Sequence, residues 1–417
     1  MFKQFATAAV GLFCCASVAQ AGSTADTVTE ALYSGAFARG LSTLEPMAAS
    51  GDSEAAFGVG AIKLTMTLQS LAQTLYRHGF DMPRSPLLGI VVGMRIPQNP
   101  DPEPFDYAGV RQMLIDLEAG LDDARASFDA AAKSGEYVIE VDPLKVRIDA
   151  NGDGTAEAGE SLAGLYALWM RLPVVDVLAR RPHSGLPLID PFGFDRADAY
   201  WLAGYPQAVA AQADFLLAHD FSSFVDATFH RAFPRAGFPM QDYSQGIGRL
   251  VMDPETDMGI ADVIAAIHTI DWPVTDASRL SSVRLRLKAV LGYSRQNWDA
   301  IMLETDDNHE LLPSPRQTPM VKGVSVTDER VAAWRATLDE ADGVLDGDLL
   351  VPHWRFKQGF DLKAYFDTAT RTDVVMLLTG FDAVPFLKDG PVASATDFRA
   401  IQAAFGNDWP GYAFWFN

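Results

Sequence analysis

The fold class is decided by residues 106–133, which read DYAGVRQMLIDLEAGLDDARASFDAAAK. Their apolar residues recur at alternating spacings of four and three, which is the period of a helix with one buried face. These residues are Val110, Leu114, Leu117, Leu121, Ala124, Phe128 and Ala131. The opposite face carries charges such as Arg111, Asp116 and Asp122. The sequence therefore predicts a long helix that packs lengthwise on a neighbour.

Similar patterns on both sides predict a mainly α protein with a multi-helix body. Upstream, residues 29–48 and 53–76 form two predicted helices joined at Ser50-Gly51-Asp52. Downstream, helices are predicted at 195–218, 259–269, 276–304 and 327–342.

The upstream junction resembles that of Sel1-type and tetratricopeptide helical repeats. The resemblance rests on ASGD at 49–52 and EAAF at 54–57, and the pattern occurs once. Solenoids of this kind need at least three stacked repeats. We therefore interpret the two helices as a single α-hairpin.

Residues 1–21 have the pattern of a secretory signal peptide. Lys3 precedes a short apolar stretch, and residues 19–21, Ala-Gln-Ala, suit a signal peptidase. Both cysteines of the chain, Cys14 and Cys15, lie in this segment, so the cleaved chain has no disulfide and no thiolate ligand. The longest later apolar run, residues 86–94, is too short to span a membrane. We expect a soluble periplasmic or secreted protein.

The proline-rich linker at 312–323 is the best candidate boundary. We expect a helical body over 22–312 and an aromatic-rich α+β segment over 324–417 docked on it. Residues 350–417 hold 14 of the 44 aromatics, and the run Val374–Leu378 has β-type composition. Rings at this density predict a core, whereas exposed Trp354, Trp409 and Trp415 would indicate a sugar-binding surface.

The most specific motif is the twelve-residue stretch 149–160, DANGDGTAEAGE. It resembles an EF-hand calcium loop at every position that the pattern tests. The resemblance implies that Ca²⁺ is bound by side-chain or backbone oxygens of six residues and that Gly154 permits the sharp turn. The implied ligands are Asp149, Asn151, Asp153, Thr155 through its carbonyl, Glu157 through a water, and Glu160 with both oxygens.

Three departures from the EF-hand pattern suggest a structural ion and not a switch. Residues 142–148 contain Pro143 and alternate in polarity, which predicts an extended segment where an EF-hand has a helix. Ala156 stands where a branched apolar residue usually pairs with a second hand, and no second loop of this pattern occurs. This resembles the single strand-loop-helix hands of exported bacterial proteins.

Other charged groups give weaker signals. Asp226 and His230 are predicted to form an ordinary surface ion pair, with His219 on the same face. The run at 306–310, DDNHE, is interpreted as a solvated acidic helix end, and the basic residues at 279–295 as partners of an acidic helix. The chain holds 33 basic and 54 acidic residues, a net charge of −21, which argues against nucleic acid or an anionic membrane as partner.

Three functions remain open, and calcium binding is favoured. We expect an exported soluble protein whose single Ca²⁺ is mainly structural, serving as a binding or scaffold module with a protein or polysaccharide partner. One alternative is an exported hydrolase whose acid/base carboxylates the sequence does not identify, so its catalytic residues stay unknown. Another is a carbohydrate-binding protein that uses the C-terminal aromatics. A deep cavity with two inward carboxylates would favour the hydrolase.

Overall fold

The computed structural model describes residues 23–81, 96–157, 160–161, 191–241, 250–307, 310, 312–318 and 326–393. The expected signal peptide, together with Trp409 and Trp415, lies outside these residues. Within the described part the protein is mainly α, with eleven α-helices and seven strands of two or three residues.

The α-helices differ widely in length. They are α1 (Thr24–Ser34), α2 (Phe37–Ala49), α3 (Ser53–Arg77), α4 (Tyr107–Ala131), α7 (Arg196–Leu217), α8 (Ser222–Thr228), α9 (Pro254–His268), α10 (Ala277–Ile301), α11 (Asp328–Asp346), α12 (Leu362–Thr368) and α13 (Val374–Thr379). Single 3-10 turns occur at η1 (Pro143–Lys145), η2 (Phe229–Arg231) and η3 (Val384–Phe386).

The short strands form three small antiparallel sheets. One joins β1 (Ile139–Val141) to β2 (Phe192–Phe194), and a second joins β3 (Asp271–Pro273) to β6 (Arg371–Asp373). The third has the order β4 (Val351–Pro352), β5 (Gly359–Phe360), β7 (Leu387–Lys388). The β3–β6 pair ties the C-terminal segment to the helical body.

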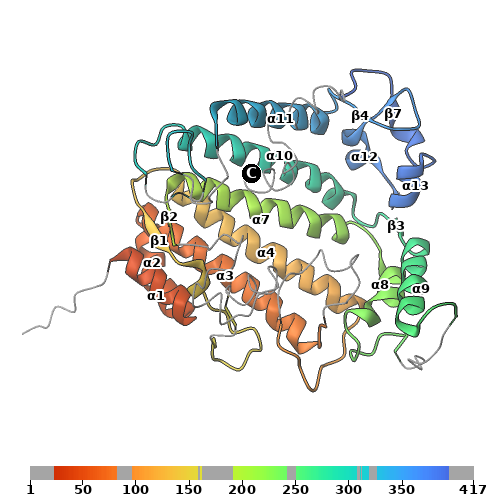
Figure 1. The fold of residues 1–417 in the computed structure, drawn as a ribbon, viewed down its shortest axis with the longest axis horizontal. Coiled ribbons are helices and arrows are strands. Elements are labelled where there is room, and N and C mark those ends of the chain that lie inside the picture. Colours follow the sequence, from red (N-terminus) through yellow and green to blue (C-terminus); the bar gives the residue numbers. More distant parts are fainter. Residues whose placement is uncertain are drawn as a thin grey trace, which may run out of the picture.

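Five long helices form the body of the part of the chain that the structure describes. Figure 1 shows α3, α4, α7, α10 and α11 side by side in that order, each packed against the next. The short helices α1 and α2 pack against α3, and α12 packs against α10 and α11. Each long helix thus buries an apolar stripe against its neighbours, as the periodicity predicts.

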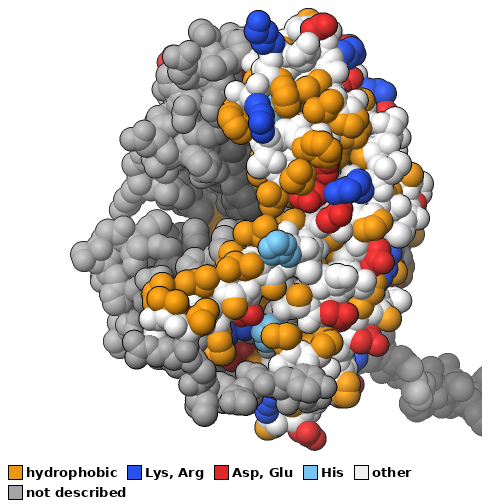
Figure 2. Space-filling view, turned by 90° about the vertical axis from the view of Figure 1, so that its right-hand side faces the viewer, with side chains coloured by type: hydrophobic (Ala, Val, Ile, Leu, Met, Phe, Trp, Pro, Cys, Tyr) orange, Lys and Arg blue, Asp and Glu red, His pale blue; other side chains and the backbone are white. Residues whose placement is uncertain are grey.

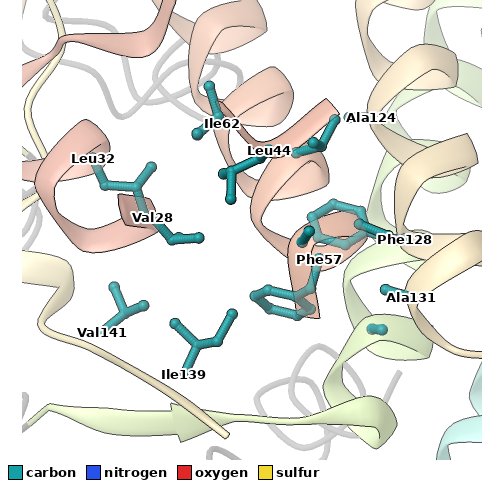
Figure 3. Close-up of a cluster of buried hydrophobic side chains, with 14 of the residues drawn as sticks. Val28, Leu32, Leu44, Phe57, Ile62, Ala124, Phe128, Ala131, Ile139 and Val141 are labelled. Atoms are coloured by element: carbon teal, nitrogen blue, oxygen red, sulfur yellow. The ribbon is translucent and has the colours of Figure 1, made fainter. Parts of the chain in front are cut away.

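One core lies where α1, α2, α3 and α4 meet β1 (Figure 3). Phe57 of α3 and Phe128 of α4 are almost fully buried, and their rings meet edge to face with centroids 5.6 Å apart. Gly60 permits this close packing, because a Cβ there would lie 2.9 Å from the Phe128 ring. Val28 and Ile139 lie in the same cluster.

Most helix starts agree with the predictions to within one residue. Asp106 begins α4 by accepting a hydrogen bond from the Gly109 N–H at 2.8 Å. Asp195, Asp276 and Thr327 act in the same way at α7, α10 and α11. Such caps satisfy N–H groups that have no partner inside the helix.

Two of the predicted helices have the largest boundary errors. The helix predicted over 29–48 is two helices, because Gly35 ends α1 in the left-handed region at φ 72°. A Cβ on Gly35 would lie 2.9 Å from the Cβ of Ala156, so α1 ends directly against the predicted calcium loop. The other error is α9, which begins at Pro254 and not at Gly259.

The β-type run Val374–Leu378 is a helix, which corrects its reading as a strand. The Asp373 side chain accepts a hydrogen bond from the Met376 N–H at 2.9 Å and so caps α13. Gly380, at φ 108°, ends the helix after one and a half turns. Local capping here outweighs the β propensity of the apolar residues.

The basic residues of α10 pair with acids of neighbouring helices, as predicted. Arg286 contacts Glu118 and Asp122 of α4 and Asp214 of α7 at 2.7 to 2.8 Å. Arg279 also contacts Glu118 and Asp214. The Asp214 side chain is 3% exposed. We call these five residues the Arg286 network, and it joins three of the long helices.

Of the described helices, α3 is long and apolar enough to cross a membrane. Half of its most apolar stretch is buried within the fold. It packs against α1, α2 and α4, as a core helix of a globular domain does.

Candidate functional site

The predicted calcium loop, residues 149–160, is fixed to the side of α3. The Asp149 N–H donates to Gln69 Oε1, and the Asp149 carbonyl accepts from Gln73 Nε2, both at 2.8 Å. Its neighbour Ile148 is buried. The first predicted ligand is therefore held by the body of the protein on both sides of its Cα.

Contacts at its base close the loop. The Ile148 N–H donates to the Glu160 carbonyl at 2.9 Å, and Arg147 pairs with Ser161 as an antiparallel bridge. The Arg147 N–H also donates to the carbonyl of Leu32 in α1 at 3.0 Å. These bonds bring the two ends of the loop together and attach them to α1.

The segment before the loop differs from the prediction. Residues 142–148 contain the 3-10 turn η1 and are not extended throughout. The turn forms because the Asp142 side chain accepts the Leu144 N–H and Pro143 cannot donate to a strand partner. The predicted exit helix after Ser161 lies outside the described residues.

The Asp149 carboxylate organises the first half of the loop. Its two oxygens accept hydrogen bonds from the N–H groups of Gly152 at 2.7 Å and Gly154 at 2.9 Å. Both glycines have positive φ, 78° and 88°, so the chain turns tightly around the carboxylate. This is the sharp turn that the motif implies at Gly154.

Asn151 and Asp153 continue the turn with their side-chain oxygens. Asn151 Oδ1 accepts the Asp153 N–H, and Asp153 Oδ1 accepts the Thr155 N–H, each at 2.8 Å. Asn151 Nδ2 donates to Asp153 Oδ2 at 3.1 Å. The side-chain oxygens of Asn151 and Asp153 are thus each bound to the backbone N–H two residues further on.

Glu160 folds back across the loop from its far end. It is 9% exposed, and its two oxygens accept the N–H groups of Asn151 at 3.2 Å and Glu157 at 3.1 Å. The Glu157 side chain is exposed. The predicted last ligand is therefore beside the predicted second and fifth.

The donor set of the loop fits calcium. It consists of carboxylate, amide and carbonyl oxygens, which a hard cation prefers, and contains no nitrogen or sulfur ligand. The loop acids are nevertheless not drawn together as closely as the most compact acidic group among the described residues. That group lies elsewhere.

This acidic cluster consists of Asp195, Glu304 and Glu310. Each contributes a carboxylate oxygen, and these oxygens lie within 4.8 Å of one another, a spacing that could hold a cation or a shared proton. Asp195 follows β2 and caps α7, Glu304 follows the last turn of α10, and Glu310 forms a bridge with Gly193 of β2. Three segments remote in sequence thus meet at one point.

Burial and the repulsion between neighbouring carboxylates raise the pKa of two members of this cluster, Asp195 and Glu304. Burial, followed by the Asp195 charge, raises the pKa of Glu304 to about 8. Burial also raises the pKa of Asp195, and it raises that of Asp198, which lies next to it, well above the usual range. Gln317 donates to Glu304 Oε2 at 3.0 Å and orients that carboxyl group.

An open cavity of about 910 Å³ adjoins the cluster. Asp195 and Glu304 line it, together with Lys133, Tyr137 and Arg196. The cavity is large enough for a small organic substrate. It presents two carboxyl groups of raised pKa beside two cations.

Sequence reasoning missed this cluster. Glu310 belongs to the run 306–310, which was interpreted as a solvated helix end, but Glu310 is only 4% exposed. Asp306 and Asp307 are exposed, as that interpretation requires. The sequence indicates Asp195 only as the residue that begins a helix. Nothing in the sequence connects Asp195 to Glu304.

The predicted surface pair of Asp226 and His230 is wrong. The helix α8 ends at Thr228, and His230 Nε2 lies 3.5 Å from Asp262 of α9 instead. His219 does not share that face, since it is fully buried and its Nε2 lies 2.8 Å from Thr372 Oγ1. Burial lowers the His219 pKa.

Comparison with known proteins gives no match: no family model matches the chain, and neither a curated protein nor a solved structure is similar to it. The function must therefore be argued from the geometry of the two acidic groups.

Proposed function

We propose that the protein is an exported, soluble calcium-binding protein whose single ion is held by the EF-hand-like loop at 149–160. The observation that carries the proposal is the arrangement of Asp149 and Glu160. Positions one and twelve of the motif face the same short run of backbone, although eleven peptide bonds separate them. A bound Ca²⁺ would supply positive charge among oxygens of Asp149, Asn151, Asp153, Thr155, Glu157 and Glu160.

The role of this ion is mainly structural. The loop bonds to Gln69 and Gln73 of α3, and Arg147 just before it bonds to Leu32 of α1, so a rigid loop helps to hold these two helices together. A single hand has no partner to open against, which argues against a switch. An affinity of about 10⁻⁴ to 10⁻³ M suits an extracellular module of this kind. The helical body then serves as a binding or scaffold module in the periplasm or outside the cell.

Calcium should raise the melting temperature of the protein by a few degrees. At about 10 mM CaCl₂, which is roughly ten to a hundred times the expected Kd, binding stabilises the folded state by about 1.4 to 2.7 kcal/mol. Differential scanning calorimetry with millimolar CaCl₂ measures the shift, and MgCl₂ should give less because Mg²⁺ dehydrates reluctantly. Glu160→Gln should remove most of the shift, whereas Glu157→Gln should remove less. Equal shifts with calcium in wild type and Glu160→Gln would contradict the assignment.

A second candidate is an acid/base hydrolase centred on Asp195 and Glu304. The observation that favours it is the cavity of about 910 Å³ lined by both carboxyl groups. A carboxyl group whose pKa lies near 8 can donate a proton at neutral pH, and a neighbour that ionises first can accept one. Loss of hydrolysis of chromogenic glycosides or esters in Glu304→Gln would support this candidate, and no turnover of such substrates by the wild type would count against it.

The raised pKa of Glu304 predicts a pH dependence of stability. The folded state keeps the Glu304 proton up to about pH 8, whereas the unfolded chain releases it near the ordinary glutamate pKa of 4.5. The Glu304 contribution is therefore present below pH 4.5 and is lost as the pH rises through 8.

Urea unfolding between pH 4.5 and 8 tests the direction in which stability changes with pH. The wild type should lose more unfolding free energy across this range than Glu304→Gln does. Glu329→Gln, at an exposed site of α11, should behave like the wild type. Identical pH profiles for wild type and Glu304→Gln would show that Glu304 titrates normally.

A further inference from the structure

We propose that the exposed ring of Trp354 and the cations beside it form a binding site for an acidic polysaccharide. The site is separate from the calcium loop and does not depend on it. Trp354 follows strand β4 and lies at the end of α13. On the face shown in Figure 2, hydrophobic side chains gather in the upper half, at the height of the C-terminal elements, with Lys and Arg side chains around them.

Three consecutive side chains hold this surface in place. They bond to the last three carbonyls of the neighbouring helix α13, which have no partner inside the helix. His353 Nε2 lies 3.1 Å from the Leu377 oxygen, and Trp354 Nε1 and Arg355 Nη1 donate at 2.8 Å to the oxygens of Leu378 and Thr379. Residues 353–355 are thus fixed in register against α13.

The Trp354 ring is fixed and open at the same time. Its only polar atom is used by the Leu378 carbonyl, yet the residue is 78% exposed. The His353 ring lies beside it at a centroid distance of 6.1 Å and an angle of 23°. A ring whose N–H is satisfied and whose face is free needs no reordering before a flat apolar ligand surface stacks on it.

Helix α13 and the residues that follow it carry further exposed apolar side chains. Leu378 is 65% exposed, Phe381 73% and Val384 55%. The buried rings of the same segment, Tyr365 and Phe366, pack instead against α7 and α10 in a core shared with the helical body. Large apolar groups left together on the surface of a soluble protein usually mark a binding site.

The charges beside Trp354 point to an anionic ligand. Arg355 and Lys357 are exposed, and neither forms an ion pair with a described carboxylate. By contrast, Lys363, Arg371 and Lys388 of the same segment pair with aspartates. These two uncompensated cations can attract an anion locally, although the net charge of −21 disfavours polyanions over the molecule as a whole.

An acidic sugar chain complements both the exposed Trp354 ring and the cations beside it. The C–H face of a pyranose ring stacks on an indole, and a guanidinium binds a carboxylate through parallel hydrogen bonds. Arg355 is already oriented by the Thr379 carbonyl and retains free N–H donors. The site therefore selects a uronic acid polymer over a neutral glucan.

Native gel electrophoresis of the full chain in gels with hyaluronate, which carries glucuronate, tests the proposal, with dextran as the neutral polymer. We expect hyaluronate to retard the wild type and dextran to do so much less. Trp354→Ala should weaken the binding at least about tenfold, the usual effect of removing an aromatic anchor. Lys357→Gln should weaken it severalfold without unfolding the protein, since Lys357 is exposed and forms no ion pair with a described carboxylate. Leu285→Ala, at an exposed site of α10, is the control and should bind like the wild type.

Melting temperatures show that each variant is folded. No retardation by hyaluronate would overturn the proposal, and so would equal retardation of wild type and Lys357→Gln. Equal retardation by dextran would overturn the selection for acid. Light scattering that shows a dimer abolished by Trp354→Ala would assign the surface to self-association instead.

Discussion

Replacing Arg286 with alanine should lower the free energy of unfolding by about 3–5 kcal/mol, because Asp214 and Glu118 then keep only Arg279 and each loses a buried charged partner. Arg286 bonds to Asp214, Glu118 and Asp122 at 2.7 to 2.8 Å. Asp214 is 3% exposed, so water cannot replace the lost partner. Because the network joins α4, α7 and α10, the loss weakens the middle of the body.

Urea unfolding followed by circular dichroism measures this effect. The matched control is Arg335→Ala, which removes a pair with Asp299 whose side chains are 40% and 64% exposed. An exposed pair of this kind contributes at most about 1 kcal/mol. Equal midpoints for Arg286→Ala and Arg335→Ala would show that the Arg286 network does not stabilise the fold.

Phe128→Ala should also lower the free energy of unfolding by about 3–5 kcal/mol, through the cavity that it leaves. Phe128 has no exposed surface and contacts Phe57 across the α3–α4 interface (Figure 3). Gly60 lies against the ring, so the backbone of α3 has no side chain there to fill the space.

The same urea measurement with Leu285→Ala provides the comparison. Leu285 is 58% exposed on α10, so its removal should change stability by less than about 0.5 kcal/mol. A Phe128→Ala protein as stable as Leu285→Ala would contradict the position of this core.

The long helices could be predicted because each carries its own evidence. In α4 the apolar stripe, the Asp106 cap and the prolines before it all lie within a few turns of chain. The break at Gly35 could not be predicted, because a single glycine interrupts an otherwise helical pattern. Ala156, which leaves no room for a side chain at position 35, is distant in the sequence. Val374–Leu378 was misread because its composition suits a strand while the Asp373 cap favours a helix.

The calcium loop and the acidic cluster also differ in whether a local pattern in the sequence reveals them. Every predicted calcium ligand lies within twelve consecutive residues, so a local pattern is enough to name Asp149 and Glu160. Asp195, Glu304 and Glu310 come together only because α7 and α10 pack side by side. The sequence identifies Trp354 as one of many aromatic residues. Its bond to α13 and its exposure are visible only in the folded protein.

Isothermal titration of the folded protein with CaCl₂ shows directly whether the loop at 149–160 binds calcium. We expect saturable binding of one Ca²⁺ per chain in the wild type, with a Kd of about 10⁻⁴ to 10⁻³ M. Glu160→Gln should abolish it, whereas Glu304→Gln should leave it unchanged, which separates the loop from the acidic cluster. Heat of binding lost in Glu304→Gln but kept in Glu160→Gln, or no heat at several millimolar calcium, would contradict calcium binding by the loop.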